Sequence, residues 1–458
     1  MAPRGQKAKR PGTALKEPLD GSRPEEESRR ARRALRPVVV LYLFLACVYA
    51  VAIPAGKGPD ETAHLRYVSW LADHHTLPVF AAVDPGADYE FHQPPLYYAL
   101  ALPVYLAAGG EPRTGGQGVR FFTAMIGLLL VYLTFALGRA LVPERPWAAV
   151  GAAGVVGLLP MQVHLATTVG NDVLTEVLVA AALLLLIRHL QAAAQTDRES
   201  DARAPGAATI AGAGILAGLG LLTKSISIVM LPVIWLGSWL AARHGGTFAW
   251  RRLGRDLLLA TALAAALGGW WLARNQVLYG DLLGQRAFVS AFEDRPSPQW
   301  YMARYHVPLP FYLIQVTLLT CASALGMFGP VRGNQFVFFP VWVYVLVGLL
   351  ALFGAIGFLR HLRRTRLNEW QRQGWWLCLA LFVLLAVGFV RFNFSFFQAQ
   401  ARYLFPALPA AALALALGLE EFVPVRWRAA AMIALPLALA ALSLTMLPLW
   451  IVPQFLSP

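Results

Sequence analysis

The sequence has 458 residues, of which 57% are hydrophobic and 14% charged, and its mean hydropathy is +0.54. Soluble domains have about 45–50% apolar and about 25% charged residues, so this composition excludes an ordinary soluble protein. The excess lies in long apolar runs such as 180–187 and 346–358. About eleven runs approach the ~20 residues that a helix needs to cross a bilayer. The composition therefore predicts an all-α, polytopic transmembrane protein.

The basic excess follows the pattern of membrane topology. Lys and Arg number 39 against 25 Asp and Glu, a formal net charge of +14. Residues 1–36 hold eleven of the basic residues and five of the acids, and this composition predicts a disordered cytoplasmic tail. Most other basic residues lie in short loops between apolar runs, as the positive-inside rule describes. The charge therefore indicates orientation in a lipid bilayer, and no nucleic-acid partner is expected.

Apolar runs and basic loops together predict the topology. With the tail in the cytoplasm, every dense Arg cluster falls on the cytoplasmic side. Two further apolar runs, 94–108 and 311–329, begin with proline and aromatic residues, and we expect both to be membrane-skimming or re-entrant helices on the outer side. The expected crossings are 38–54, 120–141, 147–166, 173–190, 207–223, 226–242, 257–273, 338–359, 375–390, 404–422 and 429–450. The expected domains are the 1–36 tail, a transmembrane core at 37–285 with an outer loop at 55–119, an outer loop at 286–337, and C-terminal transmembrane helices at 338–458.

Acidic residues occur where two of these crossings meet the outer side. Asp60 and Glu61 follow the first crossing, and the pattern from Asp60 to Trp70 predicts an amphipathic helix. Asp172 precedes a later crossing and returns to the same side. A plain alternative exists for each position, because acids at a helix start favour the helix dipole and Asp is a good N-cap.

Basic side chains occur at outer helix ends as well. The basic residues at the outer ends of the expected crossings are Lys224, Arg274 and Arg402. Cations at such a depth are costly unless they are paired or face a wet cavity, and the alternative is that they extend to the lipid headgroups. Outer carboxylates beside outer cations are typical of a site that acts on a membrane-held phosphate.

Metal motifs are weak in this sequence. Glu61-x-x-His64 has no second copy, and no His-Glu-x-x-His sequence occurs. We therefore assign no metal ligand, although a divalent metal stays open because Asp60, Glu61 and Asp172 are suitable oxygen donors.

Several short motifs resemble GT-C membrane glycosyltransferases. Pro59-Asp60-Glu61 and the run from Gln93 to Tyr98 resemble the first outer loop of protein O-mannosyltransferases (family 39) and of bacterial aminoarabinose transferases. The resemblance covers roughly 38–285 well and 395–420 weakly. The other matching motifs, in chain order, are Arg120, Pro160, Asn171-Asp172, Gly218 to Lys224, Trp271 with Arg274-Asn275, Tyr279-Gly280-Asp281, and Arg402-Tyr403 with Pro406.

The resemblance implies a GT-C fold, a donor and a site. The donor would be a polyprenyl-phosphate-linked sugar, and the acceptor a glycan, lipid or protein outside the cell membrane. Asp60 matches the catalytic acid of the family and Asp172 its second acid, and Glu61 is a further catalytic candidate. Gln93 stands where aminoarabinose transferases carry a lysine, so His92 or Lys224 is expected to supply that phosphate contact. The residues expected to bind substrate are His64, His92, Gln93, Tyr97, Asn171, Lys224, Arg274 and Arg402.

The chemistry of these residues predicts a one-step transfer. Polyprenyl phosphate is a good leaving group, so one carboxylate base, Asp60, suffices to take the proton of an acceptor hydroxyl. Lys224 and Arg274 would offset the charge of the departing phosphate. A single displacement predicts inversion at the sugar carbon. The alternatives are a lipid-linked-sugar transporter or flippase, which would need charged residues near the midplane of several helices, and a non-catalytic membrane scaffold.

Overall fold

The computed structural model describes residues 22–80, 89–195, 206–244, 248–290, 297–331 and 335–456. Within these ranges the chain is almost entirely helical, and its single sheet pairs two short antiparallel strands, β1 (Met327–Phe328) and β2 (Val337–Phe338). The predicted all-α class is confirmed.

Nine helices of the described ranges are long and apolar enough to cross a membrane, and the number rises to eleven if two bent helix pairs each count as one span. The nine are α1 (Ser22–Ala52), α4 (Pro112–Leu141), α7 (Asp172–Gln195), η2 (Ser225–Val229) with α9 (Met230–Ala242), α10 (Trp250–Tyr279), α14 (Val341–Arg364), α15 (Glu369–Ser395), η3 (Ala401–Ala407) with α16 (Leu408–Glu421), and the run η4 (Val425–Trp427), α17 (Arg428–Met446), η5 (Leu447–Ile451) and α18 (Val452–Leu456). The bent pairs are α5 (Pro146–Leu158) with α6 (Pro160–Ala166), at 61°, and α12 (Pro298–Arg304) with α13 (Leu309–Leu325), at 118°. The remaining helices are α2 (Glu61–His74), η1 (Tyr89–His92), α3 (Leu96–Ala107), α8 (Ala207–Leu221) and α11 (Gln285–Ser290). The prediction of a multi-pass membrane protein is therefore confirmed, with nine to eleven candidate spans where about eleven were expected.

Three expected segments differ in detail from the structure. The crossing expected at 207–223 is the 15-residue α8, which is shorter than a full span but packs between α7 and α10. The apolar run at 94–108 forms the 12-residue α3, whose rise of about 18 Å is too short to cross a bilayer. The run at 311–329 falls in the sharply bent α12–α13 pair, a geometry compatible with a re-entrant segment.

The N-terminal tail is partly helical, which corrects the prediction of disorder through residue 36. Helix α1 begins at Ser22, before the apolar run, and two ion pairs spaced four residues apart support its first turns. These pairs join Arg29 to Glu25 and Arg30 to Glu26. Such pairs stabilise a helix by about 0.2–0.5 kcal/mol each. Residues 1–21 lie outside the described ranges.

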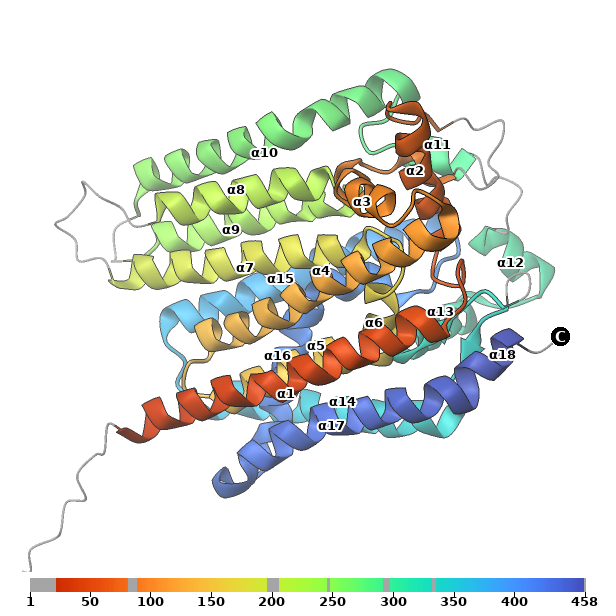
Figure 1. Cartoon of the computed structure of the whole chain (residues 1–458). Coiled ribbons are helices and arrows are strands. Elements are labelled where there is room, and N and C mark those ends of the chain that lie inside the picture. Colours follow the sequence, from red (N-terminus) through yellow and green to blue (C-terminus); the bar gives the residue numbers. More distant parts are fainter. Residues whose placement is uncertain are drawn as a thin grey trace, which may run out of the picture.

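Helix α7 lies at the centre of the bundle. In its most apolar stretch 83% of the residues are buried, against 17% in α14. Its partners include α4, α8, α9 and α15 (Figure 1). Because α7 is apolar around almost its whole circumference, it is most stable when other helices surround it on all sides. The acid at its first residue, Asp172, is thereby held inside the protein.

Small residues allow α8 and α10 to approach closely. A Cβ atom at Gly214 would lie 2.7 Å from the backbone of Ala260, and one at Gly268 would lie 2.8 Å from the carbonyl oxygen of Gly218. Small residues at such spacing let transmembrane helices pack backbone against backbone. This contact fixes the end of α8, from which Lys224 follows.

The two ends of the bundle differ in charge and structure. One end carries α2, α3 and α12 and is here named the α2 end (Figure 1). The opposite end holds the dense basic loops. These loops contain Arg145, Arg243, Arg251, Arg252, Arg255, Arg360, Arg363, Arg364, Arg366, Arg426 and Arg428. This separation is the one expected from the positive-inside rule.

Candidate functional site

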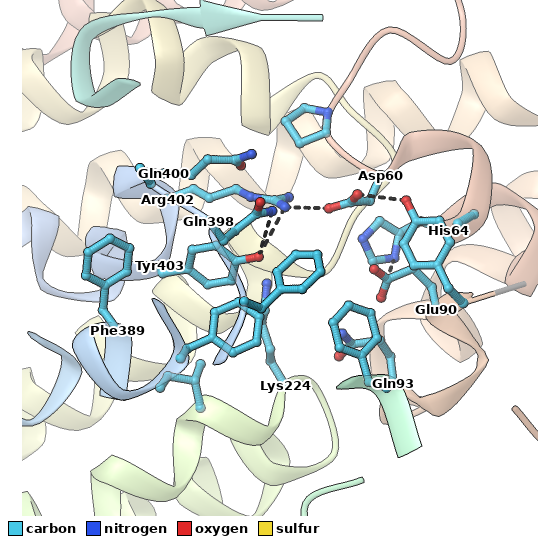
Figure 2. Close-up of a pocket in the computed structure, with 18 of the residues that line it drawn as sticks. Asp60, His64, Glu90, Gln93, Lys224, Phe389, Gln398, Gln400, Arg402 and Tyr403 are labelled. Atoms are coloured by element: carbon cyan, nitrogen blue, oxygen red, sulfur yellow. Dashed lines mark hydrogen bonds and ion pairs between the residues drawn. The ribbon is translucent and has the colours of Figure 1, made fainter. Parts of the chain in front are cut away.

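A cavity of about 750 Å³ opens at the α2 end. Part of its lining is polar, and this part contains Asp60, His64, Glu90, Lys224 and Arg402 (Figure 2). Another part is aromatic, and its rings include Phe288, Tyr301, Phe389, Phe392, Phe396, Phe397 and Tyr403. The cavity therefore offers charged groups and a large apolar surface to one ligand.

Asp60 lies in the turn between α1 and α2. Its φ of 54° is in the left-handed region, which is uncommon for residues other than glycine. The side chain makes no capping hydrogen bond to α2. Its carboxylate instead pairs with Arg402 and accepts a hydrogen bond of 2.7 Å from the Tyr89 hydroxyl. Asp60 therefore occupies the N-cap position of α2, but its side chain bonds Arg402 and Tyr89 and does not cap the helix.

Asp172 joins the same network from a distant part of the chain. Its carboxylate pairs with Lys224, and the second oxygen lies 3.5 Å from Arg402. Arg402 thus bridges the two acids, and its guanidinium points across to Asp60 in Figure 2. Lys224 and Arg402 are 13% and 3% exposed, so both cations are paired within the protein and do not extend toward headgroups.

Helix direction explains why these four side chains meet. Asp60 follows α1 and Lys224 follows α8, so both come after helices that end at the α2 end. Asp172 opens α7 and Arg402 lies in η3, and both of these helices begin there. Each residue sits where an apolar run stops, and the packing of the helices brings the four positions together.

Burial and neighbouring charge shift the pKa values of the loop residues in different directions. Burial alone would raise the pKa of Asp60, but the adjacent guanidinium of Arg402 outweighs it and holds that pKa well below its usual range. Burial raises the pKa of Glu90 and lowers the pKa of His64. Asp60 is therefore ionised at neutral pH, whereas Glu90 keeps its proton more readily.

Glu61, expected to be a catalytic candidate, borders the cavity, and its carboxylate is bound by neighbouring donors. Its two oxygens accept from Arg120 Nε at 2.6 Å and Nη2 at 2.7 Å. They also accept from the backbone N–H groups of Gly56, Gly58 and Val169 at 2.9–3.3 Å. The side chain is 3% exposed, so its acceptor capacity is used in holding the α1–α2 turn.

Two more expected substrate ligands are buried away from the cavity. The Tyr97 hydroxyl bonds Thr123 at 2.7 Å and accepts from the Gly170 N–H. The Asn171 amide donates to Gln93 Oε1 at 3.3 Å and to the Thr223 carbonyl at 2.9 Å. Neither residue lines the cavity, so both position the loops around it.

Arg274 does not reach the cavity either. It donates to the Pro78 carbonyl at 2.7 Å, and its guanidinium lies 4.6 Å from the ring centroid of Trp271. It fastens the segment after α2 to α10, and Arg402 takes the place beside the acids that the sequence suggested for Arg274.

His92 and Gln93 do line the cavity, as expected. His92 Nδ1 lies 2.6 Å from the Tyr89 carbonyl, and its ring packs on Phe288 with 4.9 Å between centroids. Burial lowers the pKa of His92 to about 4. A neutral imidazole is therefore available for hydrogen bonding but does not replace the charge of a lysine.

Sequence reasoning missed several lining residues. Glu90 lies beside His64, and Tyr403 lies under both cations, with Lys224 Nζ 5.5 Å and Arg402 Cζ 5.2 Å from its ring centroid. The acid at position 90 was detectable, since it stands shortly before the Gln93-Pro94-Pro95 motif. Other polar residues that were missed include Tyr89, Gln398 and Gln400.

One family matches part of the sequence. A model of the dolichyl-phosphate-mannose-protein mannosyltransferase family matches residues 110–280. That range contains Arg120, Asp172, Lys224 and Arg274. No curated protein matches the sequence.

Solved structures match most of the chain. The apo oligosaccharyltransferase of Archaeoglobus fulgidus superposes with a TM-score of 0.52 and 17% identity over 92% of this chain and 55% of that one, so this chain spans about half the length of that protein. The same archaeal protein, AglB, in complex with an inhibitory peptide and a dolichol-phosphate gives a TM-score of 0.50 at 16% identity, over 92% and 55%. ArnT from Cupriavidus metallidurans, bound to undecaprenyl phosphate, gives 0.51 at 16% identity, over 91% and 73%. The resemblance to GT-C membrane glycosyltransferases is confirmed, and the chain has their fold.

Proposed function

We propose that this protein transfers a sugar from a polyprenyl-phosphate-linked donor to an acceptor hydroxyl at the extracytoplasmic face of the cell membrane. One observation carries the proposal. Two carboxylates and two cations from distant segments form a single network beside a cavity of about 750 Å³ at one end of a membrane helix bundle. A site of that kind suits a ligand with an anionic head and an apolar tail.

The donor phosphate would bind Lys224 and Arg402. Arg402 offers a planar fork of donors and Lys224 a compact charge, and both groups are common phosphate ligands. Without a ligand the two cations are paired with Asp60 and Asp172. A phosphate would compete with these carboxylates for the same donors, so donor binding would loosen Asp60 from Arg402.

The lipid part of the donor would lie on the aromatic lining. Phe389 and Phe392 line the cavity from α15, whose most apolar stretch is only 33% buried by the protein. Much of α15 therefore faces lipid, so a polyprenyl chain leaving the cavity along α15 would keep its apolar surface out of water.

The reaction would be a direct displacement with Asp60 as the base. The acceptor oxygen bonds to the anomeric carbon while the bond from that carbon to the phosphate oxygen breaks. The acceptor proton goes to Asp60, and polyprenyl phosphate leaves as an anion stabilised by Lys224 and Arg402. One displacement inverts the configuration of the sugar carbon.

The basic loops support an extracytoplasmic position for the α2 end. They lie at the opposite end of the bundle, which the positive-inside rule assigns to the cytoplasm. The ligands bound in two structures of the same fold, undecaprenyl phosphate in ArnT and dolichol-phosphate in AglB, support a polyprenyl carrier.

The test uses purified protein in proteoliposomes. Polyprenyl phosphates carrying different sugars are supplied with membrane glycans, lipids and peptides as acceptors, and the release of free polyprenyl phosphate is followed by mass spectrometry. Release is expected with at least one sugar. Lys224→Ala should raise the donor KM by about 10–100-fold, because a charged hydrogen bond contributes about 1.5–3 kcal/mol.

Arg113→Ala is the matched control, since Arg113 is an exposed cation at the same end of the bundle. Its donor KM should stay at the wild-type value. A Lys224→Ala variant that changes only the acceptor KM would overturn the phosphate assignment, and absence of release with every donor would overturn the proposed function.

A further inference from the structure

Three potential metal ligands meet at the polar side of the cavity. Asp60 precedes α2, His64 lies on its first turn, and Glu90 lies in η1. One ligand atom from each of the three residues lies within 4.8 Å of the other two. Figure 2 shows His64 and Glu90 side by side, close to Asp60. The proposed transfer reaction uses Asp60 but requires neither His64 nor Glu90.

One carboxylate oxygen of Glu90 is buried without a hydrogen-bond donor beside it. Its Oε2 is buried and has no hydrogen-bond partner, and the side chain is 7% exposed. The nearest basic atom is His64 Nδ1 at 4.0 Å, and that nitrogen already lies 2.7 Å from the Tyr98 hydroxyl. Burying such an acceptor without a partner costs about 1–3 kcal/mol, so a group that supplies the missing partner is favoured.

We propose that Asp60, His64 and Glu90 bind a divalent cation at the wall of the cavity. Two carboxylate oxygens and one imidazole nitrogen are a donor set suited to Zn²⁺ or Mn²⁺. Ligand atoms on a tetrahedral zinc ion lie about 3.3–3.6 Å apart, given bonds of about 2.0–2.2 Å. The three side chains must therefore draw together by about 1 Å. Three protein ligands leave coordination positions free toward the cavity.

The neighbouring acids are not available for this ion. Glu61 is occupied by Arg120, and Asp172 is occupied by Lys224. These were two of the three acids that the sequence offered for a metal. Asp60 is paired with Arg402, but Arg402 also contacts Asp172 and keeps that partner if the ion takes a carboxylate oxygen of Asp60.

The surroundings of His64 orient its ring. The Tyr98 hydroxyl bonds the imidazole, and the rings of Tyr98 and Tyr67 stack with centroids 3.8 Å apart. Such supporting contacts fix a ligating histidine and are part of a metal site. An ion placed here could accept a phosphate oxygen in a free position, a role that rests on the proposed function, whereas binding of the ion does not.

The test measures binding of the metal alone to the full-length protein. Protein in detergent is treated with EDTA, dialysed and titrated with Mn²⁺ by electron paramagnetic resonance and with Zn²⁺ by calorimetry. One ion per chain is expected. Glu90→Gln and His64→Gln should each weaken binding at least about 10-fold, since loss of supporting groups alone costs 10–100-fold.

Glu111→Gln is the control, because Glu111 is an exposed acid at the same end of the bundle. It should bind the ion as the wild type does, and equal unfolding temperatures of the metal-free variants would show that all are folded. Unchanged binding in Glu90→Gln and His64→Gln overturns the proposal, as does absence of binding to the wild type. The release of polyprenyl phosphate, measured in parallel, separates the two proposals: release without metal binding removes the ion alone.

Discussion

At the end of the bundle opposite α2, Asp256 on α10 lies 3.4 Å from His189 on α7, and neither side chain is exposed. Arg255 and Arg252 approach the same carboxylate at 2.8 and 3.8 Å. At the α2 end, Asp60 also pairs with an arginine, yet its own side chain is 27% exposed and lines a cavity. Both ends bury ion pairs, but none of the residues of the Asp256 cluster lines that cavity.

A second cluster at the opposite end has the same character. Arg145 lies 3.6 Å from Glu420 and 4.0 Å from Glu421, and His361 lies 3.8 Å from Glu421. These contacts tie the start of α5 to the ends of α14 and α16. In this protein, a buried ion pair by itself therefore indicates a contact that holds two helices together. The feature that separates the α2 end from both clusters is the cavity, because unpartnered buried oxygens also occur in them, at Asp256 and Glu420.

Asp60→Asn tests the catalytic side of this comparison. Loss of the base should lower kcat by about 10²–10⁴-fold, the usual contribution of a positioned acid or base. The unfolding temperature should change little, because Arg402 retains Asp172. Turnover in proteoliposomes and thermal unfolding in detergent are the two measurements. Near-normal kcat would remove Asp60 from the role of base.

Glu61→Ala, at the next residue in the chain, should lower the stability of the folded protein. It leaves the buried Arg120 without its carboxylate, and breaking such a pair costs about 3–5 kcal/mol. The unfolding temperature should fall, and the α1–α2 turn should become susceptible to proteolysis. A variant that unfolds like the wild type but has lost turnover would return Glu61 to the catalytic residues.

Asp256→Asn probes the opposite end. The loss of charge should lower the free energy of unfolding by about 1–3 kcal/mol, because His189 and the adjacent arginines lose their partner. Thermal unfolding measures this change, and the donor KM should stay at the wild-type value. A large rise in donor KM would show that the two ends are coupled and would break the comparison.

Arg274→Ala should have the smallest effect on the reaction. The residue fastens the segment at Pro78 and does not line the cavity. The donor KM should stay within about twofold of the wild-type value, since surface-type contacts away from a site change energies by about 0.5 kcal/mol. A rise like that expected for Lys224→Ala would show that Arg274 reaches the phosphate.

The sequence determined the class of fold and the side on which the acids and cations meet. An apolar run of about 20 residues has few places other than a bilayer, and its ends must lie at the two membrane surfaces. Four residues each border such a run, so their position at the same membrane surface was predictable from spacing alone. They are Asp60, Asp172, Lys224 and Arg402.

Only the tertiary structure decided what each of these groups does. Asp60 and Glu61 are adjacent in the chain and both border the cavity, yet Asp60 pairs with Arg402 while Glu61 is bound by Arg120 and backbone N–H groups. Arg402 rather than Arg274 bridges the acids, and Glu90 meets His64 through the fold of the loop. The physical reason is that a charge buried near the membrane must find its partners through packing in three dimensions, and the spacing of residues along the chain does not contain that packing.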